Sequence, residues 1–236
     1  MAERNVPEGS DENTSDLRRT IGVLFEPGDV VELRALKDAV VASGYFDIFE
    51  ELAAQAAKLD GRGFAVYATL NPTEPALLAR SRNRVKTHPK ATTSDTNITR
   101  RRWLPVDVDP VRPANVSSTD DEKQAAVRRA REIRDYLGEQ GWPEPLVGDS
   151  GNGAHLLYRI DLPNDQESLE LVKGVLGALA FKFSDESVNV DTSTANAARI
   201  WKLYGTTARK GDHTEDRPHR RSRLLEIPKE VEACRP

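Results

Sequence analysis

Apolar residues recur at strand and helix spacings through the second half of the chain, and this pattern predicts a regular α+β unit. Short apolar or alternating runs predict four strands, at about 102–109, 143–147, 155–160 and 188–191. Apolar residues at helical spacing predict one helix after Thr119, where Thr119-x-x-Glu122 matches a capping box, and another after Asp165. The order strand, helix, strand, strand, helix, strand is the split βαβ order of an RRM-like or ferredoxin-like sheet.

The first part of the chain has a less regular pattern, which we interpret as a separate α/β lobe. Residues 1–20 are mostly polar or charged and are expected to form a disordered tail. The pattern that follows predicts a strand, two helices and a second strand, at about 21–25, 30–40, 47–59 and 64–70. We therefore expect an N-terminal α/β lobe over about 21–95 and an RRM-like lobe over about 96–228.

Length and composition fit one large domain or two closely packed lobes. The chain has 236 residues, of which 38% are hydrophobic, enough to form a core. No run approaches the roughly 18–20 apolar residues of a transmembrane helix, and the polar N-terminus lacks the apolar stretch of a signal peptide. We therefore expect a cytoplasmic protein with no membrane partner. Because Cys234 is the only cysteine, a metal ion held within one chain would have oxygen and imidazole ligands.

Charge is distributed unevenly along the chain, although the net charge is only -4. Segment 80–102 carries 8 basic side chains and 1 acidic one, and segment 199–223 carries 8 basic and 3 acidic side chains. The low net charge argues against a protein that coats nucleic acid, but these segments could contact phosphates without regard to sequence. The alternative for each segment is an ordinary solvated surface. Our candidates for DNA contacts are Arg82, Arg84, Lys86, Arg100 and Arg101.

Two aspartates lie two residues apart at the end of the strand predicted at 102–109. Because alternate residues of a strand share a face, Asp107 and Asp109 are expected to project together, while Val106 and Val108 point into the core. Two adjacent carboxylates repel each other unless a cation lies between them, and Mg²⁺ or Mn²⁺ suits carboxylate and phosphate oxygens. Two such ions could assist a phosphoryl transfer. The alternative is that Asp-Val-Asp-Pro only ends a strand.

The segment Ser150-Gly151-Asn152-Gly153 separates two predicted strands and ends close to His155. Two glycines around a polar residue allow positive φ and close backbone approach, so successive N–H groups could cradle a phosphate. The Ser150 hydroxyl and the His155 ring could donate to the same anion. The alternatives are a plain hairpin with a glycine-rich turn and a structural histidine.

Further along the chain, Asp191 follows the strand predicted at 188–191 and is a candidate third metal ligand, or else an ordinary cap or turn residue. Arg199 and Lys202 are candidates for contacts with nucleotide phosphates. Strict alternation would place these two cations on opposite faces of a strand. Either the segment is not a regular strand, or only one of them reaches the nucleotide.

Taken together and in this order, these motifs resemble the archaeo-eukaryotic primase superfamily. The similarity is to the bifunctional primase-polymerase catalytic domain of phages, mobile elements and some CRISPR-associated proteins, and it covers about 21–228. The D-x-D pair at Asp107 and Asp109, the small-residue turn ending in His155 and the acidic residue Asp191 match the family's three motifs. The segments 69–72, 103–113 and 199–206 add to the similarity.

The resemblance implies an α+β fold in which an RRM-like palm sheet, with helices on one side, joins an N-terminal α/β lobe, and the active-site cleft lies between them. It implies a DNA primase and DNA polymerase in which Asp107, Asp109 and Asp191 hold two Mg²⁺ or Mn²⁺ ions. The nucleotide would contact Ser150, Gly151, Asn152, Gly153, His155, Arg199 and Lys202. The implied partners are a single-stranded DNA template, a primer and dNTP or NTP, with a helicase, reverse transcriptase or Cas proteins in the wider context.

Two other functions use the same residues. A metal-dependent nuclease or nucleotide hydrolase would employ the carboxylates with water as the nucleophile, and would act without a template. A non-catalytic DNA-binding replication module would bind DNA in a salt-sensitive way, without regard to metal or to Asp107. The choice between ribonucleotides and deoxyribonucleotides depends on side chains near the sugar 2′-position, which the sequence does not place.

Overall fold

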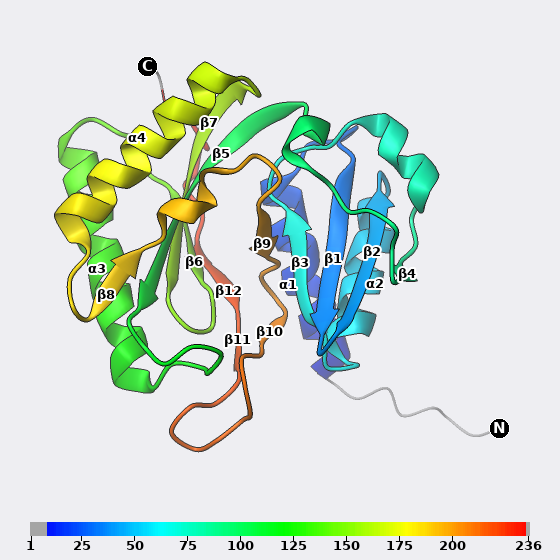
Figure 1. The fold of residues 1–236 in the computed structure, drawn as a ribbon, viewed down its shortest axis with the longest axis horizontal. Helices are drawn as coiled ribbons and strands as arrows, with labels where there is room; N and C mark the ends of the chain where they lie inside the picture. The colour runs from blue at the N-terminus through cyan, green and yellow to red at the C-terminus, as the bar shows by residue number, and fades with distance from the viewer. Residues whose placement is uncertain (1–8, 235–236) are drawn as a thin grey trace.

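The protein contains two five-stranded sheets, one in each lobe (Figure 1). The computed structural model describes residues 9–234, with side chains from residue 14 onward. The sheet of the first lobe has the order β4-β2-β1-β3-β9, and neighbouring strands are antiparallel. Its elements are α1 (Gly9–Leu24), β1 (Val31–Lys37), β2 (Val40–Phe46), α2 (Phe49–Asp60), β3 (Ala65–Thr69), β4 (Lys86–Thr87) and β9 (Ile200–Lys202).

Helix α1 replaces the tail expected over residues 9–20 and the short strand expected at 21–25. Leu17, Ile21 and Leu24 recur at helical spacing and are almost fully buried, so their burial stabilises a helix through a segment that is polar elsewhere. The expected disorder of residues 1–8 lies outside the described residues.

A hairpin of β1 and β2 replaces the helix expected at about 30–40. Val31, Leu33 and Ala35 alternate into the core, and Asp38 in the turn adopts a positive φ of 50°, which aspartate tolerates better than most residues. The alternate residues Glu32 and Arg34 form an ion pair on the opposite face. The predicted helix rested on the approximate helical spacing of Val30, Leu33, Leu36 and Val40. That spacing concealed a strand with a period of two.

The second lobe is the predicted RRM-like unit. Its sheet has the order β12-β6-β7-β5-β8, and α3 and α4 cover one face (Figure 1). The elements are β5 (Arg100–Pro110), α3 (Asp120–Glu139), β6 (Leu146–Asp149), β7 (Ala154–Pro163), α4 (Gln166–Phe183), β8 (Val188–Val190) and β12 (Arg223–Glu226). The predicted split βαβ order is confirmed, and β12 adds a strand at the β6 edge.

Both predicted helix starts are also confirmed. Thr119 accepts a hydrogen bond from the Glu122 N–H, and the Glu122 carboxylate accepts one from the Thr119 N–H, which completes the capping box. Asp165 accepts a hydrogen bond from Ser168 N–H at the start of α4. These local signals fix the residue at which each helix begins.

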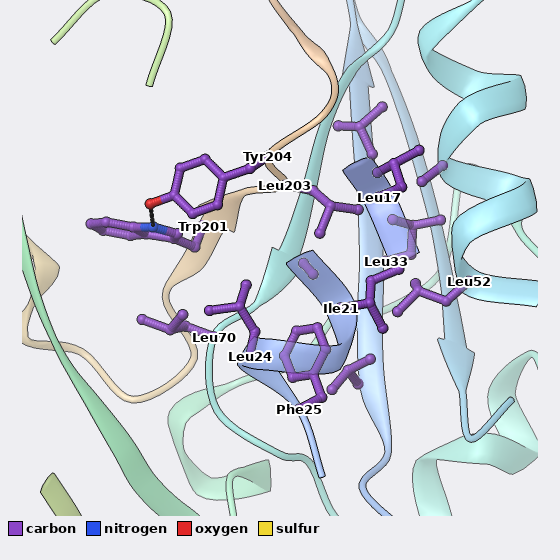
Figure 2. Close-up of a cluster of buried hydrophobic side chains, with 14 of the residues drawn as sticks. Leu17, Ile21, Leu24, Phe25, Leu33, Leu52, Leu70, Trp201, Leu203 and Tyr204 are labelled. Carbon is purple, nitrogen blue, oxygen red and sulfur yellow. Dashed lines mark hydrogen bonds between the residues drawn. The ribbon is translucent and has the colours of Figure 1, made fainter. Parts of the chain in front are cut away.

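An apolar core joins the two lobes. Trp103, Leu146 and Leu157 of the second sheet pack with residues of α1, β1 and α2, and Trp103 Nε1 donates to the Leu24 carbonyl at 3.2 Å. Trp201 and Tyr204 belong to the same cluster, shown in Figure 2. The remaining short elements are η1 (Pro75–Arg80), η2 (Asp95–Asn97), η3 (Thr192–Ala195), β10 (Thr207–Ala208) and β11 (Arg220–Arg221).

The chain crosses between the lobes near its end. Strand β9 pairs with β3 in the first sheet, and β12 then pairs with β6 in the second. The predicted division near residue 95 therefore does not hold for the whole chain, because residues 200–202 complete the first sheet. Among the helices that the structure describes, none combines the length and apolar character required to span a bilayer.

Candidate active site

The central strand β5 carries the predicted carboxylate pair. Val106 and Val108 are completely buried against the helices, whereas Asp107 and Asp109 lie on the opposite face, which turns toward the first lobe. The predicted division of β5 into two faces is therefore confirmed. Asp107 is paired in register with His155 on β7, and Asp109 with Asn189 on β8.

A cleft of about 300 Å³ lies over this face, between the two sheets. Most of the residues predicted from the sequence to form a nucleotide and metal site line this cleft. They are Asp107, Asp109, Ser150, Asn152, His155, Asp191, Arg199 and Lys202. Residues from distant segments of the chain thus converge on one cavity.

The two carboxylates of the pair have opposite pKa shifts. Burial and the negative charge of Asp107 raise the pKa of Asp109, and Arg112 and Lys210 only partly offset this. Burial acts in the same direction on Asp107, but attraction by His155, followed by Lys210 and Arg112, outweighs it and lowers the pKa of Asp107. Such a division is expected when two like charges share one poorly solvated site, and a bound cation would relieve the conflict.

The Asp107 and Asp109 pair fits a divalent cation. Asp107 Oδ1 is buried and accepts no hydrogen bond of good geometry, and His155 Nε2 lies 3.4 Å from it. A buried carboxylate oxygen without a donor is costly unless a cation satisfies it. Oxygen ligands of this kind suit Mg²⁺ or Mn²⁺.

Asp191 lies beside this pair but is used differently in the structure. Its N–H donates to the Asp107 carbonyl at 2.9 Å, and its carboxylate caps η3 by accepting from Ser193 N–H at 2.8 Å. Across residues 14–234, no group of three or more His, Cys, Asp or Glu side chains is already arranged as a metal site. The Asp191 carboxylate would have to leave its cap to become a third ligand.

A buried hydrogen-bond chain orients His155. Trp201 Nε1 donates to the Tyr204 hydroxyl at 3.0 Å, and that hydroxyl lies 2.9 Å from His155 Nδ1. Burial raises the pKa of Tyr204, so its hydroxyl remains a donor, and His155 Nδ1 is the acceptor within reach. The remaining proton of a neutral His155 is then on Nε2, the atom that faces Asp107 and the cleft.

The glycine-rich turn does not form the free phosphate cradle that we predicted. The Gly151 N–H donates to Asp149 Oδ1, while the N–H groups of Asn152 and Gly153 both donate to Ser150 Oγ. The Asn152 carboxamide oxygen accepts from Ser118 N–H. The three N–H groups thus close a hairpin, and the turn offers side chains rather than a row of free N–H groups.

Close packing explains the second glycine of this turn. A Cβ atom at Gly153 would lie 2.3 Å from the Val108 carbonyl oxygen and 3.0 Å from Asp109 Oδ1. We expect Gly153→Ala to destabilise the fold by about 2 kcal/mol, which lowers Tm by about 4–8 °C in a chain of this length. Thermal unfolding would measure the change. Gly174→Ala is the matched control, because a Cβ atom there would meet nothing within 4 Å apart from its chain neighbours and the backbone of its own helix, and alanine favours the α4 helix. An equal Tm for both variants would contradict the packing argument.

Arg199 and Lys202 both line the cleft, which resolves the alternation problem. Strand β9 begins at Ile200, so Arg199 precedes it and strict alternation does not apply. Arg199 donates to the carbonyl and hydroxyl of Ser193. Lys202 is buried, donates to the Thr207 carbonyl at 2.7 Å, and lies 5.3 Å above the centre of the Tyr67 ring.

Sequence reasoning missed several residues of the site. Lys210 Nζ and Arg112 Nη2 lie 4.0 and 3.5 Å from Asp109 Oδ2, and Arg209 lines the cleft while pairing with Asp60. The high basic content of 199–223 pointed to two of these three cations. Leu36 and Tyr67 form the opposite wall. Nothing in the pattern signalled Leu36, because its strand was expected to be a helix.

The residues predicted to contact DNA phosphates lie outside the cleft. Arg82, Arg84 and Lys86 are exposed on the first lobe, and Arg100 is exposed at the start of β5. Arg101 is different, because it is 4% exposed and donates to the Ala195 carbonyl at 2.7 Å. Its role is within the fold rather than on a template surface.

The fold defined by these two lobes is primase-like. No protein-family model matches the sequence, and no curated protein matches it. A solved structure described as "Crystal structure of primase RepB'" is similar to this chain, with a TM-score of 0.51 and 13% sequence identity. The match covers 91% of this chain and 56% of that chain, so this chain spans little more than half the length of its structural neighbour.

Proposed function

We propose that this protein is a template-directed nucleotidyltransferase that adds nucleotides along single-stranded DNA. The observation that supports this most strongly is the composition of the cleft. A carboxylate pair with one unsatisfied buried oxygen shares a cavity of about 300 Å³ with a group of cations. The cations that line the cavity are Arg199, Lys202, Arg209 and Lys210, and Arg112 lies beside Asp109. A metal–triphosphate complex matches this arrangement of charges.

Asp107 and Asp109 would hold the divalent ions, with Asp191 as a third ligand once its carboxylate turns from η3. When bound, two such ions lower the pKa of an attacking hydroxyl and neutralise a triphosphate. The remaining side chains would bind and orient the substrate. His155 would donate from Nε2 to a phosphate oxygen, and Lys202 would add a positive charge at the cleft wall.

The structural comparison supports the same proposal. The neighbour is described as a primase, and the likeness extends over both lobes, since it covers 91% of this chain. Priming and primer extension are both proposed for this chain on that basis, with Mg²⁺ or Mn²⁺ as cofactor and dNTP or NTP as substrate.

The direct test is incubation of the protein with a homopolymeric single-stranded template, Mg²⁺ or Mn²⁺, and labelled nucleotides, with and without a primer. We expect incorporation only of nucleotides complementary to the template. Triphosphate or DNA breakdown without template dependence would instead indicate a hydrolase or nuclease. DNA binding that is indifferent to metal, with no synthesis, would indicate a non-catalytic replication module.

Nucleotide binding is expected to weaken as the pH rises through about 7. Burial lowers the pKa of Lys202 to about 7, with Asp60 opposing the shift and Arg209 adding to it. Only the protonated ammonium attracts phosphate, so the favourable state is present below this pKa and is lost above it. In Lys202→Arg the guanidinium stays charged, so this component of the pH dependence should disappear.

The measurement is the Kd of a nucleoside triphosphate, without metal, at several pH values on both sides of about 7. Comparison with Lys202→Arg at each pH removes the titration of the nucleotide itself. Identical pH profiles for the wild type and Lys202→Arg would refute a phosphate contact by Lys202.

A further inference from the structure

Five side chains form a single row across the first sheet. The register pairs Lys86 of β4 with Ser43 of β2, Ser43 with Arg34 of β1, Arg34 with Tyr67 of β3, and Tyr67 with Lys202 of β9. Directly paired residues share a face of a sheet, so all five lie on the face opposite α1 and α2. The row ends in the cleft, where Tyr67 and Lys202 form part of the wall.

The other end of the row opens into a second hollow, of about 390 Å³, at the β2 and β4 edge of the sheet. Its lining includes Ser43 and Lys86 together with three more basic residues. These are Arg80, His88 and Lys90. Among the residues that the structure describes, no acidic side chain lines this hollow.

Hydrogen bonds among neighbouring residues hold the lining of this hollow in place. Arg80 Nη1 donates to the Tyr45 hydroxyl at 3.1 Å, and Lys86 Nζ donates to the Arg80 carbonyl at 2.8 Å. Thr93 Oγ1 also contacts the Tyr45 hydroxyl, at 3.2 Å. Arg80 and Lys86 are therefore bound to neutral oxygens, and among the described residues neither these two cations nor Lys90 forms an ion pair with a carboxylate. Such a site favours an anion.

The chemistry and length of the row identify the class of anion. Four inter-strand steps span about 19 Å, which is the length of five or six stacked nucleotides at about 3.4 Å each. Tyr67 offers an aromatic face beside the cleft, while the hollow offers positive charge and hydroxyl groups at the far end. Aromatic faces and a basic groove are the features by which proteins hold single strands without sequence preference.

We propose that a track for single-stranded nucleic acid runs from the cleft to the Arg80–Lys90 hollow, with the hollow as a phosphodiester site at its distal end. Between the two ends the sheet is covered, since Ser43 is 3% exposed and donates to the buried Glu32, so the strand would contact the protein mainly at the cleft and at the hollow. The identity of that strand as the template rests on the proposed function, whereas strand binding itself does not. The track would hold the strand several nucleotides away from the carboxylate pair. It would thereby keep the strand bound while one base of the strand leaves the cleft and the next one enters it.

The test replaces Lys86 and Lys90 together by Gln and measures binding of labelled oligothymidylates of about 4, 8 and 16 nucleotides by fluorescence anisotropy. For the longer oligomers, the slope of log K against log salt should become shallower by about 1.4, since each lost single-strand phosphate contact removes about 0.7. The Kd of a nucleoside triphosphate should not change. Lys58→Gln with Lys173→Gln is the matched control, because both lysines are exposed on helices away from this face.

An unchanged salt slope, or an equal decrease in the control variant, would overturn the proposal. Weaker binding of the free triphosphate without any change for long oligomers would also overturn it, since the hollow would then be a nucleotide site. Strand binding by the variant Asp107→Asn with Asp109→Asn separates this proposal from the proposed function, because the variant should keep the wild-type salt slope while it loses DNA synthesis. Strand binding with the expected slope but no DNA synthesis by the wild type would support the track and refute the polymerase.

Discussion

Replacing Asp107 and Asp109 together by Asn is expected to reduce nucleotide incorporation by at least about 1,000-fold, equivalent to about 4 kcal/mol of transition-state stabilisation. The carboxamides keep the size of the side chains but remove the negative charges that would attract divalent ions. The fold should be retained, and its Tm should not decrease, because the substitution also removes repulsion between two like charges within the site.

Primer extension on a single-stranded template, with thermal unfolding of the same samples, measures both effects. Asp121→Asn with Asp135→Asn is the matched control, since these two carboxylates are exposed on α3 and lie outside the cleft. Undiminished synthesis by the Asp107 and Asp109 variant would rule out the metal assignment. A large loss of Tm would show instead that the pair contributes to folding.

The second large effect is expected at Asn71, whose replacement by Ala should destabilise the protein by about 3 kcal/mol. The Asn71 side chain is buried; its oxygen accepts from the N–H of Arg102 at 2.8 Å and of Trp103 at 3.4 Å, and its Nδ2 donates to the Ala197 carbonyl at 2.9 Å. Alanine leaves these buried groups without a partner, at about 1–3 kcal/mol for each. One carboxamide thus ties β5 to the segment that leads into Arg199.

Thermal unfolding should show a decrease in Tm of about 6–12 °C for Asn71→Ala. Asn189→Ala removes a carboxamide that is exposed on β8, and it should leave Tm nearly unchanged. If Asn71→Ala unfolds at the wild-type temperature, the contacts of Asn71 do not hold the two segments together.

The second lobe could be predicted from the sequence because its signals are local. The capping residues Thr119 and Asp165, and the alternation of Val106, Asp107 and Val108, depend on residues within a few positions of each other. The same locality identified the two carboxylates on one face. Boundaries differed by a few residues, as at β6, because neighbouring strands rather than local pattern decide where pairing ends.

The first lobe was less predictable because its pattern is decided by partners distant in sequence. Glu32 is completely buried, and its carboxylate is stable there because Arg34, the Ser43 hydroxyl and the Thr93 N–H donate hydrogen bonds to it. Without those partners, the alternation of 31–36 looks like an interrupted apolar run. The expected phosphate cradle failed for a similar reason, since Ser150 Oγ occupies the N–H groups of its own turn.

The two crossings of the chain, through β9 and β12, mean that neither half is self-sufficient. A polypeptide ending near residue 95 would expose β3 as an unpaired edge, which invites aggregation. A polypeptide beginning there would carry β9 with no sheet to join. Recombination that exchanged one lobe between related genes would therefore have to carry a compatible 200–226 segment, and the two lobes are expected to be inherited together.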